Sequence, residues 1–179
     1  MNPLKPLFFE QTLRHWHFEA LVQESKLSRE RVHFYLKELQ KKRFVIRVKP
    51  KGKMPYYSTN LENTSFRMEK RLFGLTILQE SGLFDHLYAN PAIKTAILFG
   101  SFARGDWGKS SDVDLFMYGD DTNFEKGKFE LLLRRELQVF SFNVPQKIKE
   151  ELNPALISNI TKGFNIKGDL EPFEVIIHA

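Results

Sequence analysis

The segment Thr95-Ala-Ile-Leu-Phe-Gly-Ser-Phe-Ala-Arg-Gly-Asp-Trp-Gly-Lys-Ser-Ser-Asp-Val-Asp-Leu-Phe-Met-Tyr118 carries the strongest local signals in this chain of 179 residues. It opens with an apolar run, Ala96 to Phe99, that has the length and composition of a buried strand. Gly100-Ser101 ends this run, and a polar loop with further glycines follows. A second strand is predicted over residues 112–118. The segment therefore predicts two strands joined by a short helix and a loop.

Two carboxylates stand at the start of the second strand. Successive side chains on a strand point to opposite faces, so Asp112 and Asp114 are expected to project from the same face. They repel each other unless a positive charge lies between them, and oxygen ligands favour Mg²⁺ or Mn²⁺ over zinc. Backbone N–H groups at Gly100 and Ser101 suit a phosphate, since glycine permits close approach. Each feature alone is typical of an ordinary strand end or turn, but together they predict a site for a metal-bound nucleoside triphosphate.

The order of these motifs resembles a known enzyme superfamily. Gly100-Ser101-Phe-Ala-Arg-Gly105 followed by Ser111-Asp112-Val-Asp114-Leu is similar to the signature of the DNA polymerase beta-type nucleotidyltransferases, above all their minimal prokaryotic domains. The resemblance extends over about residues 64 to 179. It implies metal-dependent nucleotidyl transfer, with Mg²⁺ or Mn²⁺ as the cofactor. It also implies a set of site residues: the catalytic, metal-binding Asp112 and Asp114, and the nucleotide-binding Gly100, Ser101, Arg104 and Lys109.

Members of this superfamily carry a third carboxylate on a later strand, which holds the catalytic ion and helps to take a proton from the attacking hydroxyl. In this chain the later strand is predicted over residues 137–142, and the matching position is Gln138, a neutral residue. Glu136 shares its face, two residues earlier, and is an alternative ligand if the strand starts early. Arg104 also has an alternative role, because it can pair with Asp106 instead of the triphosphate.

The first third of the chain is strongly basic. Residues 1–60 hold 13 Lys and Arg against 5 Asp and Glu, whereas the whole chain has a net charge of +5. This asymmetry indicates two modules with different partners. The expected elements are a helix that begins with the N-cap Ser28 and runs to Lys42, a strand over 44–49, a cationic turn over 50–55 and a strand over 56–59.

This order of elements resembles the winged helix-turn-helix domains of prokaryotic transcription regulators, over about residues 5 to 60. Leu27-Ser28-Arg29, Tyr35-Leu36-Lys37-Glu38-Leu39 and the cationic hairpin carry the likeness. It implies binding of double-stranded DNA, through Arg29, His33, Lys37, Lys41, Lys51 and Lys53. Phe34 departs from the family pattern, which has a polar or basic residue there. Contact with a thymine methyl group and packing against the second module remain alternatives for it.

The predicted fold class is α+β, in three regions. These are a winged helix-turn-helix DNA-binding domain (1–60), connecting helices (61–92) and a nucleotidyltransferase-like domain (93–179). The last is expected to have a mixed sheet with helices on one side, a helix from Pro145 towards Ile160 and a terminal strand over 173–178. The connecting helix, Ser65 to Glu80, is a natural homodimer surface, although core packing explains its apolar residues equally well.

Composition excludes several classes of function. The chain has no cysteine, which excludes disulfides, thiolate zinc sites and cysteine nucleophiles. No apolar stretch approaches a membrane span, and the N-terminus lacks a long apolar core with a cleavage site, so a cytoplasmic protein is expected. Its five histidines are scattered and show no ligand-like clustering.

Three functional hypotheses follow from these observations. The first is a DNA-bound nucleotidyltransferase with an unknown acceptor. The second is a transcription regulator whose degenerate transferase domain only senses a nucleotide, which Gln138 favours. The third is a module that binds a small helical partner protein, as minimal transferases of the superfamily commonly do.

Overall fold

The structure, a computed structural model, describes residues 2–173, and the chain divides into two compact units between Lys70 and Arg71. This boundary falls within helix α4 (Thr64–Glu80), so one continuous helix contributes residues to both units. Each unit has a hydrophobic core of its own and is described separately. Among the helices of residues 2–173, none combines the length and the hydrophobicity that a membrane crossing requires.

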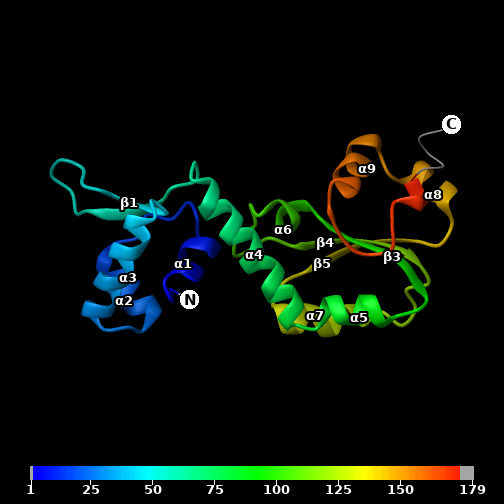
Figure 1. Cartoon of the computed structure of the whole chain (residues 1–179), viewed down its shortest axis with the longest axis horizontal. Coiled ribbons are helices and arrows are strands. Elements are labelled where there is room, and N and C mark those ends of the chain that lie inside the picture. Colours follow the sequence, from blue (N-terminus) through cyan, green and yellow to red (C-terminus); the bar gives the residue numbers. More distant parts are fainter. Residues whose placement is uncertain (1, 174–179) are drawn as a thin grey trace. The chain divides into compact units, whose positions relative to one another are not determined.

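The first unit contains three helices followed by a two-stranded antiparallel sheet (Figure 1). Its elements are α1 (Lys5–Glu10), α2 (Phe18–Ser25), α3 (Arg29–Lys41), β1 (Val45–Val48) and β2 (Tyr56–Thr59). Ser28 is the N-cap of α3, as predicted, and its side chain accepts a hydrogen bond from the Arg31 N–H. An isolated bridge pairs Trp16 with Tyr57, so the segment before α2 lies along the outer edge of β2.

Burial in the first unit follows the helical spacing of its apolar residues. On α3, Val32, Leu36 and Leu39 are buried, as their spacing predicts. They belong to a core that also includes Phe8, Phe9 and Trp16. The remaining face of α3 is open to solvent and polar apart from Phe34, and this face carries most of the basic residues predicted to contact DNA.

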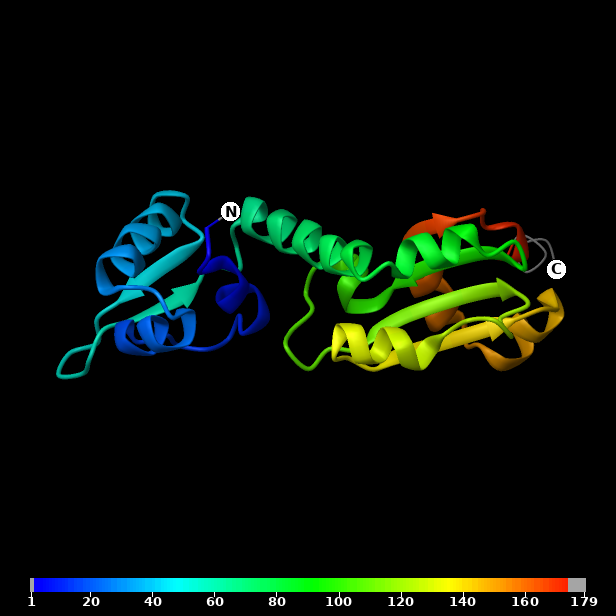
Figure 2. The ribbon, with the colours of Figure 1, turned by 90° about the horizontal axis from the view of Figure 1, so that it is seen from below.

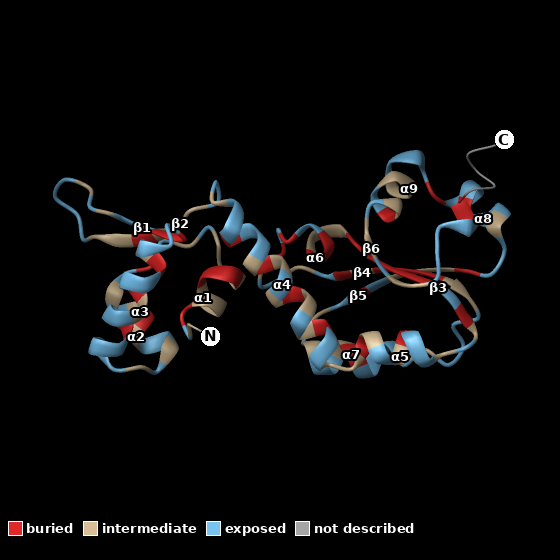
Figure 3. Cartoon of the chain, in the orientation of Figure 1, coloured by how far each residue is buried: buried red, intermediate tan, exposed pale blue. Residues whose placement is uncertain are grey.

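The second unit is built on a four-stranded sheet with strand order β5-β4-β3-β6. In chain order its elements after α4 are α5 (Leu83–Ala89), β3 (Ile93–Phe99), α6 (Gly100–Arg104), β4 (Val113–Gly119), α7 (Lys126–Leu133), β5 (Leu137–Phe142), α8 (Pro145–Glu151), α9 (Pro154–Thr161) and β6 (Phe164–Lys167). β3 pairs antiparallel with both β4 and β6, whereas β4 and β5 run parallel through the α7 crossover. The sheet is therefore mixed, as predicted. Burial concentrates along β3 and β4 (Figure 3).

Helices cover both faces of this sheet, so the expectation of helices on one side only is wrong. α5 and α7 lie against one face, and α8 and α9 lie against the other (Figures 1 and 2). On the second face, Ile148 of α8 and Ile160 of α9 join a core cluster with Ile97 and Phe116 of the central strands. The two central strands are consequently apolar on both sides, which explains their nearly continuous apolar sequence.

The region after β5 also differs from the prediction. The expected single helix from Pro145 to Ile160 is two helices, because the chain is extended at Leu152 and Pro154 starts a new helix. Asn153 caps this second helix by accepting a hydrogen bond from the Leu156 N–H at 2.8 Å. Of the strand predicted over 173–178, all residues after Phe173 lie outside the described part of the chain.

Candidate nucleotide-binding site and basic surface of the first unit

The turn from β3 into α6 brings the backbone against the side chain of Asp114. Gly100 has a φ of +66°, a left-handed conformation that favours glycine. A Cβ atom at this position would lie 1.9 Å from Asp114 Oδ2 and 2.7 Å from its Cγ. Only a glycine fits this close approach without displacing the carboxylate. The predicted Gly-Ser turn and the predicted carboxylate pair therefore meet in space.

Asp112 and Asp114 lie at the start of β4, on either side of the buried Val113. Asp112 is exposed and Asp114 is half-buried. Burial raises the pKa of the Asp114 carboxyl, and the negative charge of Asp112 raises it further. The charge of Arg104 and a hydrogen bond from the Ser101 backbone N–H act in the opposite direction on the same pKa. The Ser101 N–H, expected to face a phosphate, is thus already engaged by Asp114.

The third strand places two polar residues next to this pair. In the parallel register, Val113 lies opposite Leu137 and Asp114 lies opposite Gln138. Glu136 comes just before β5, and its carbonyl accepts a hydrogen bond from the Val113 N–H at 2.9 Å. The two-residue period of a strand puts Glu136 and Gln138 on the same side. Both are exposed. Within residues 2–173, no three acidic or histidine side chains are close enough together to hold a metal ion.

The two predicted cations of the site lie at the surface. Arg104 Nε is 3.1 Å from Asp106 Oδ2, so the alternative ion pair is present, and both residues are exposed. Lys109 is also exposed, in the loop between α6 and β4. Neither position prevents a contact with a phosphate, since an exposed ion pair contributes little energy and exchanges readily.

The sequence prediction missed Arg135, which lies just after the C-terminal end of α7 and contacts the loop between α6 and β4. Its Nη1 atom donates to the backbone carbonyls of Gly108, Lys109 and Ser111 at 2.7, 2.9 and 2.9 Å. A pair of arginines before a strand resembles a solvated charge run, so the sequence contains no signal for this role. The partners lie 24 to 27 residues earlier in the chain.

The basic residues predicted to contact DNA are exposed on α3 and on the turn between β1 and β2. On α3, Arg29, His33, Lys37 and Lys41 recur every four residues and so share one stripe of the helix. Lys51 and Lys53 lie in the turn. Arg29 is not free: its Nη1 is 2.6 and 2.5 Å from the two carboxylate oxygens of Glu19 on α2.

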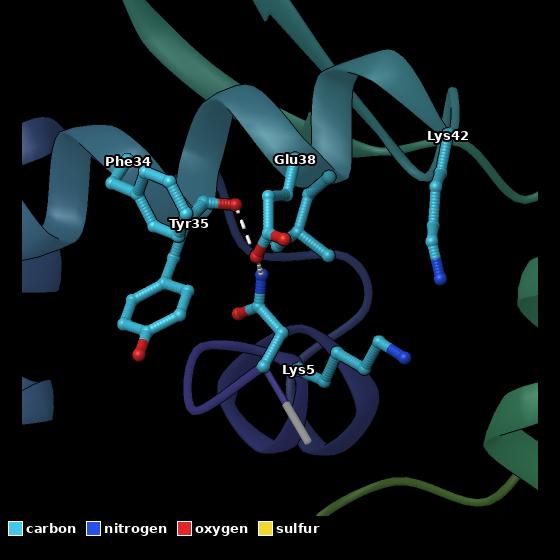
Figure 4. A pocket seen from close by; sticks show the side chains of 7 residues that line it. Lys5, Phe34, Tyr35, Glu38 and Lys42 are labelled. Atoms are coloured by element: carbon cyan, nitrogen blue, oxygen red, sulfur yellow. Dashed lines mark hydrogen bonds between the residues drawn. The ribbon is translucent and has the colours of Figure 1, made fainter.

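Phe34 lies beside this stripe and is 59% exposed. With Tyr35 and Glu38 of the same helix, and Lys42 directly after it, Phe34 lines a hollow of about 370 Å³ (Figure 4). The N-terminal segment closes this hollow, where the Asn2 side-chain amide donates to the Tyr35 carbonyl at 3.0 Å. Phe34 is thus an apolar residue open to solvent at the edge of the basic surface.

Comparison with known proteins finds a family similarity within the second unit. The model of the family described as Polymerase beta, Nucleotidyltransferase matches residues 83–167, from the first residue of α5 to the last of β6. No curated protein matches the chain.

Two solved structures are similar at low identity. A mutant of the toxin-antitoxin MntA-HpeT shares 14% identity over 60% of this chain and 87% of that chain, with a TM-score of 0.36. A candidate nucleotidyltransferase from Sulfolobus solfataricus shares 17% identity over 49% of this chain and 80% of that chain, with a TM-score of 0.28. The family match is narrower than the predicted resemblance and leaves out α4. Residues 83–167 are thus similar to the polymerase beta nucleotidyltransferase family.

Proposed function

We propose that the second unit binds a nucleoside triphosphate as its Mg²⁺ or Mn²⁺ complex. The observation that supports this most strongly is the fit between Gly100 and Asp114. The backbone approaches a half-buried carboxylate more closely than any residue with a Cβ allows, and that carboxylate also faces the charge of Asp112. A structural turn gains nothing from two neighbouring like charges, whereas a metal site requires them.

The residues present suit a hard divalent cation. Asp112 and Asp114 would hold it, and the exposed Arg104 and Lys109 would contact the phosphates. When bound, the ion would neutralise charge on the triphosphate and polarise its phosphorus–oxygen bonds. The missing Cβ of Gly100 makes room for the Asp114 carboxylate and so brings the turn beside the expected metal position. The Ser101 N–H donates a hydrogen bond to Asp114. Ser101 would therefore act by orienting this metal-binding carboxylate.

Calorimetry with each of the four common ribonucleoside triphosphates and Mg²⁺ tests this proposal. Asp112→Asn combined with Asp114→Asn is expected to abolish metal-dependent binding while leaving the fold intact. Asp120→Asn combined with Asp121→Asn is the matched control, because these exposed carboxylates lie past the far end of the same strand. If the site double mutant keeps its metal-dependent affinity, the proposal is wrong.

A bound nucleotide at this site would either be transferred to an acceptor or serve as a signal, and the identity of residue 138 bears on which of the two occurs. Nucleotidyl transfer to an unknown acceptor requires a base or a third anionic ligand near the metal. The residue opposite Asp114 is a glutamine, which supports the second candidate function, a regulator that binds the nucleotide as a signal. A small helical partner protein and a homodimer remain predictions for either outcome.

We also propose that the first unit binds double-stranded DNA through phosphate contacts. The stripe of basic residues on α3 and the two turn lysines support this, since both are exposed and belong to one compact unit. Binding should weaken as salt rises, with a log–log slope of about −0.9 per phosphate contacted. Neutralising two contacts should therefore reduce the slope by roughly two units.

Fluorescence anisotropy of the full chain with a mixed-sequence duplex measures this slope. Lys37→Ala combined with Lys41→Ala should weaken binding and flatten the salt dependence. The control, Lys147→Ala with Lys149→Ala, removes two exposed lysines of α8 in the second unit and should change neither. Salt-insensitive binding, or an equal effect of both pairs, would contradict DNA binding by the first unit.

A further inference from the structure

We infer that Arg135 is a positioning residue for the candidate nucleotide site. Its guanidinium holds the loop between α6 and β4 in the shape that presents Lys109 and Asp112. The inference rests on the proposed function in one respect, namely that these loop residues serve a nucleotide.

The contacts of Arg135 converge on the backbone of this loop. One guanidinium nitrogen donates to three carbonyl groups, at 2.7 to 2.9 Å, within a stretch of four residues that ends at Ser111. Ser111 is the residue immediately before Asp112. Hydrogen bonds from a charged donor are stronger than those between neutral groups. The loop carbonyls are therefore held by a single side chain from outside the loop.

The guanidinium is itself held in place by aromatic rings. Its carbon lies 5.2 Å from the ring centroid of Phe102 and 5.5 Å from that of Trp107. These two rings are stacked, with centroids 5.2 Å apart and planes 8° apart, and both side chains are buried. Trp107 packs so closely on α4 that a Cβ on Gly74 would lie 2.6 Å from its Nε1. Arg135 thus packs on a ring of α6 and on the buried ring at the start of the loop, and it donates to the carbonyls at the end of the same loop.

The loop also has hydrogen bonds of its own across this turn. The Gly108 N–H donates to Ser111 Oγ at 2.8 Å, and the Ser111 N–H donates to the Gly108 carbonyl at 3.2 Å. Both join neutral groups, so without Arg135 this polar, glycine-containing segment would lose its strongest donor. Arg135 also immediately precedes Glu136, so it connects the shape of the loop to the start of β5.

A lysine cannot take over this role. An ammonium group also has three N–H donors, but it sits on a flexible stem and lacks the planar face that stacks on the rings of Phe102 and Trp107. Arg135→Lys should therefore keep the positive charge and lose the clamp, that is, the hydrogen bonds from residue 135 to the loop carbonyls. The matched control is Arg134→Lys, which changes the neighbouring exposed arginine in the same way.

Hydrogen–deuterium exchange of the full chain tests the inference without any nucleotide. In Arg135→Lys the amides of Gly108 and Ser111 should exchange at least about tenfold faster, the effect of losing hydrogen bonds to a charged donor. Amides in β3 and β4 should keep their protection, and Arg134→Lys should match the wild type. Calorimetry should show weaker binding of Mg²⁺–ATP, or of the triphosphate that the wild type prefers, in Arg135→Lys and not in Arg134→Lys.

Unchanged exchange in Arg135→Lys would overturn the inference, and so would a loss of protection spread over the whole second unit. If the wild type binds no triphosphate, the proposed function fails, yet the exchange comparison still decides the role of Arg135. If Arg135→Lys does not fold, nitrogen-15 NMR of the wild-type arginine side chains decides instead. A clamped Arg135 gives resolved, slowly rotating Nη signals, and rapid averaging of these signals would overturn the inference.

Discussion

Gln138 lies directly opposite Asp114, because β4 and β5 pair in parallel with these two residues in register. Their side chains point to the same side of the sheet, so an amide occupies the place next to a half-buried carboxylate. The amide oxygen can accept a hydrogen bond or contact a metal. It carries no charge and cannot remove a proton at neutral pH. With Gln138 beside Asp114, the site is therefore expected to favour binding of a nucleotide over nucleotidyl transfer.

Replacing the amide by a carboxylate should favour transfer. Gln138→Asp is expected to raise the rate of pyrophosphate release by about a hundredfold or more when an acceptor is present, because each 1.4 kcal/mol or so of transition-state stabilisation is worth about tenfold. Radiolabelled triphosphate with Mg²⁺ or Mn²⁺ provides the measurement. Gln146→Asp on α8 is the control for an added surface charge. If the wild type is already fast and Glu136→Gln abolishes activity, Glu136 is the third ligand and the sensor hypothesis fails.

Adding a methyl group at Gly100 should damage the site more than the fold. Gly100→Ala forces an alanine into the left-handed region, at a cost of about 1–2 kcal/mol, and its Cβ would push Asp114 aside. We expect a lower melting temperature and a loss of metal-dependent nucleotide binding. Gly127→Ala is the control: this glycine lies in α7, and a Cβ added there would meet no atom within 4 Å, so the change should be neutral or stabilising. Equal effects of the two substitutions would contradict the close approach at Gly100.

Removing the charge of Asp114 should stabilise the free protein. The pKa of this carboxyl is raised by burial and by Asp112, so the folded chain binds a proton more readily than the unfolded chain. The contribution of Asp114 to stability is therefore greatest below the ordinary carboxyl pKa and falls as pH rises through the raised value. Asp114→Asn should melt at a higher temperature than the wild type at neutral pH, and the difference should vanish in acid.

Two further measurements make this pH prediction specific. Mg²⁺ should raise the melting temperature of the wild type and leave Asp114→Asn unchanged. Asp120→Asn is expected not to stabilise, because hydrogen bonds from Thr122 lower the pKa of Asp120 and its charge is favourable in the fold. If the wild type melts at a higher temperature than Asp114→Asn at neutral pH, the charge of Asp114 does not destabilise the free protein and the prediction is wrong.

The ion pair between Glu19 and Arg29 should restrain DNA binding. The pKa of Arg29 is raised by its hydrogen bond to Glu19 and by the charge of that carboxylate, so the guanidinium is held while DNA is absent. Glu19→Gln should free Arg29, remove a negative charge and strengthen duplex binding in an anisotropy titration. In an Arg29→Ala background the same substitution should have a smaller effect. Equal effects in both backgrounds would mean that Arg29 does not contact DNA.

The parts of the second unit that follow local patterns were predictable from the sequence. The apolar run before Gly100 and the alternation around Val113 identify β3 and β4, because the burial of a strand depends on the pattern of apolar residues within the strand itself. Pro154 also marks the break between α8 and α9, since a proline interrupts a helix, and the prediction of one helix towards Ile160 overlooked it.

The features that escaped prediction depend on residues far apart in the chain. Whether a helix packs above or below a sheet is decided by the path of the chain between strands, so α5 and α7 could not be assigned to a face from their own sequences. The clamp by Arg135 depends on carbonyl groups of the loop at residues 108–111. Every residue has a carbonyl, so no side-chain pattern marks those that receive a hydrogen bond.

The parallel pairing of β4 with β5 has a consequence for how the site assembles during folding. β3 and β4 are close in sequence and can pair early, since closing a short loop costs little entropy. β5 can join only after the α7 crossover has formed, and the antiparallel β6 pairs with β3 from still further along the chain. Gly100 and Asp114 should therefore come together before Gln138 and Arg135 arrive. A folding intermediate would leave Asp114 in water, where its repulsion from Asp112 is weak, and the repulsion would grow only as Asp114 becomes half-buried.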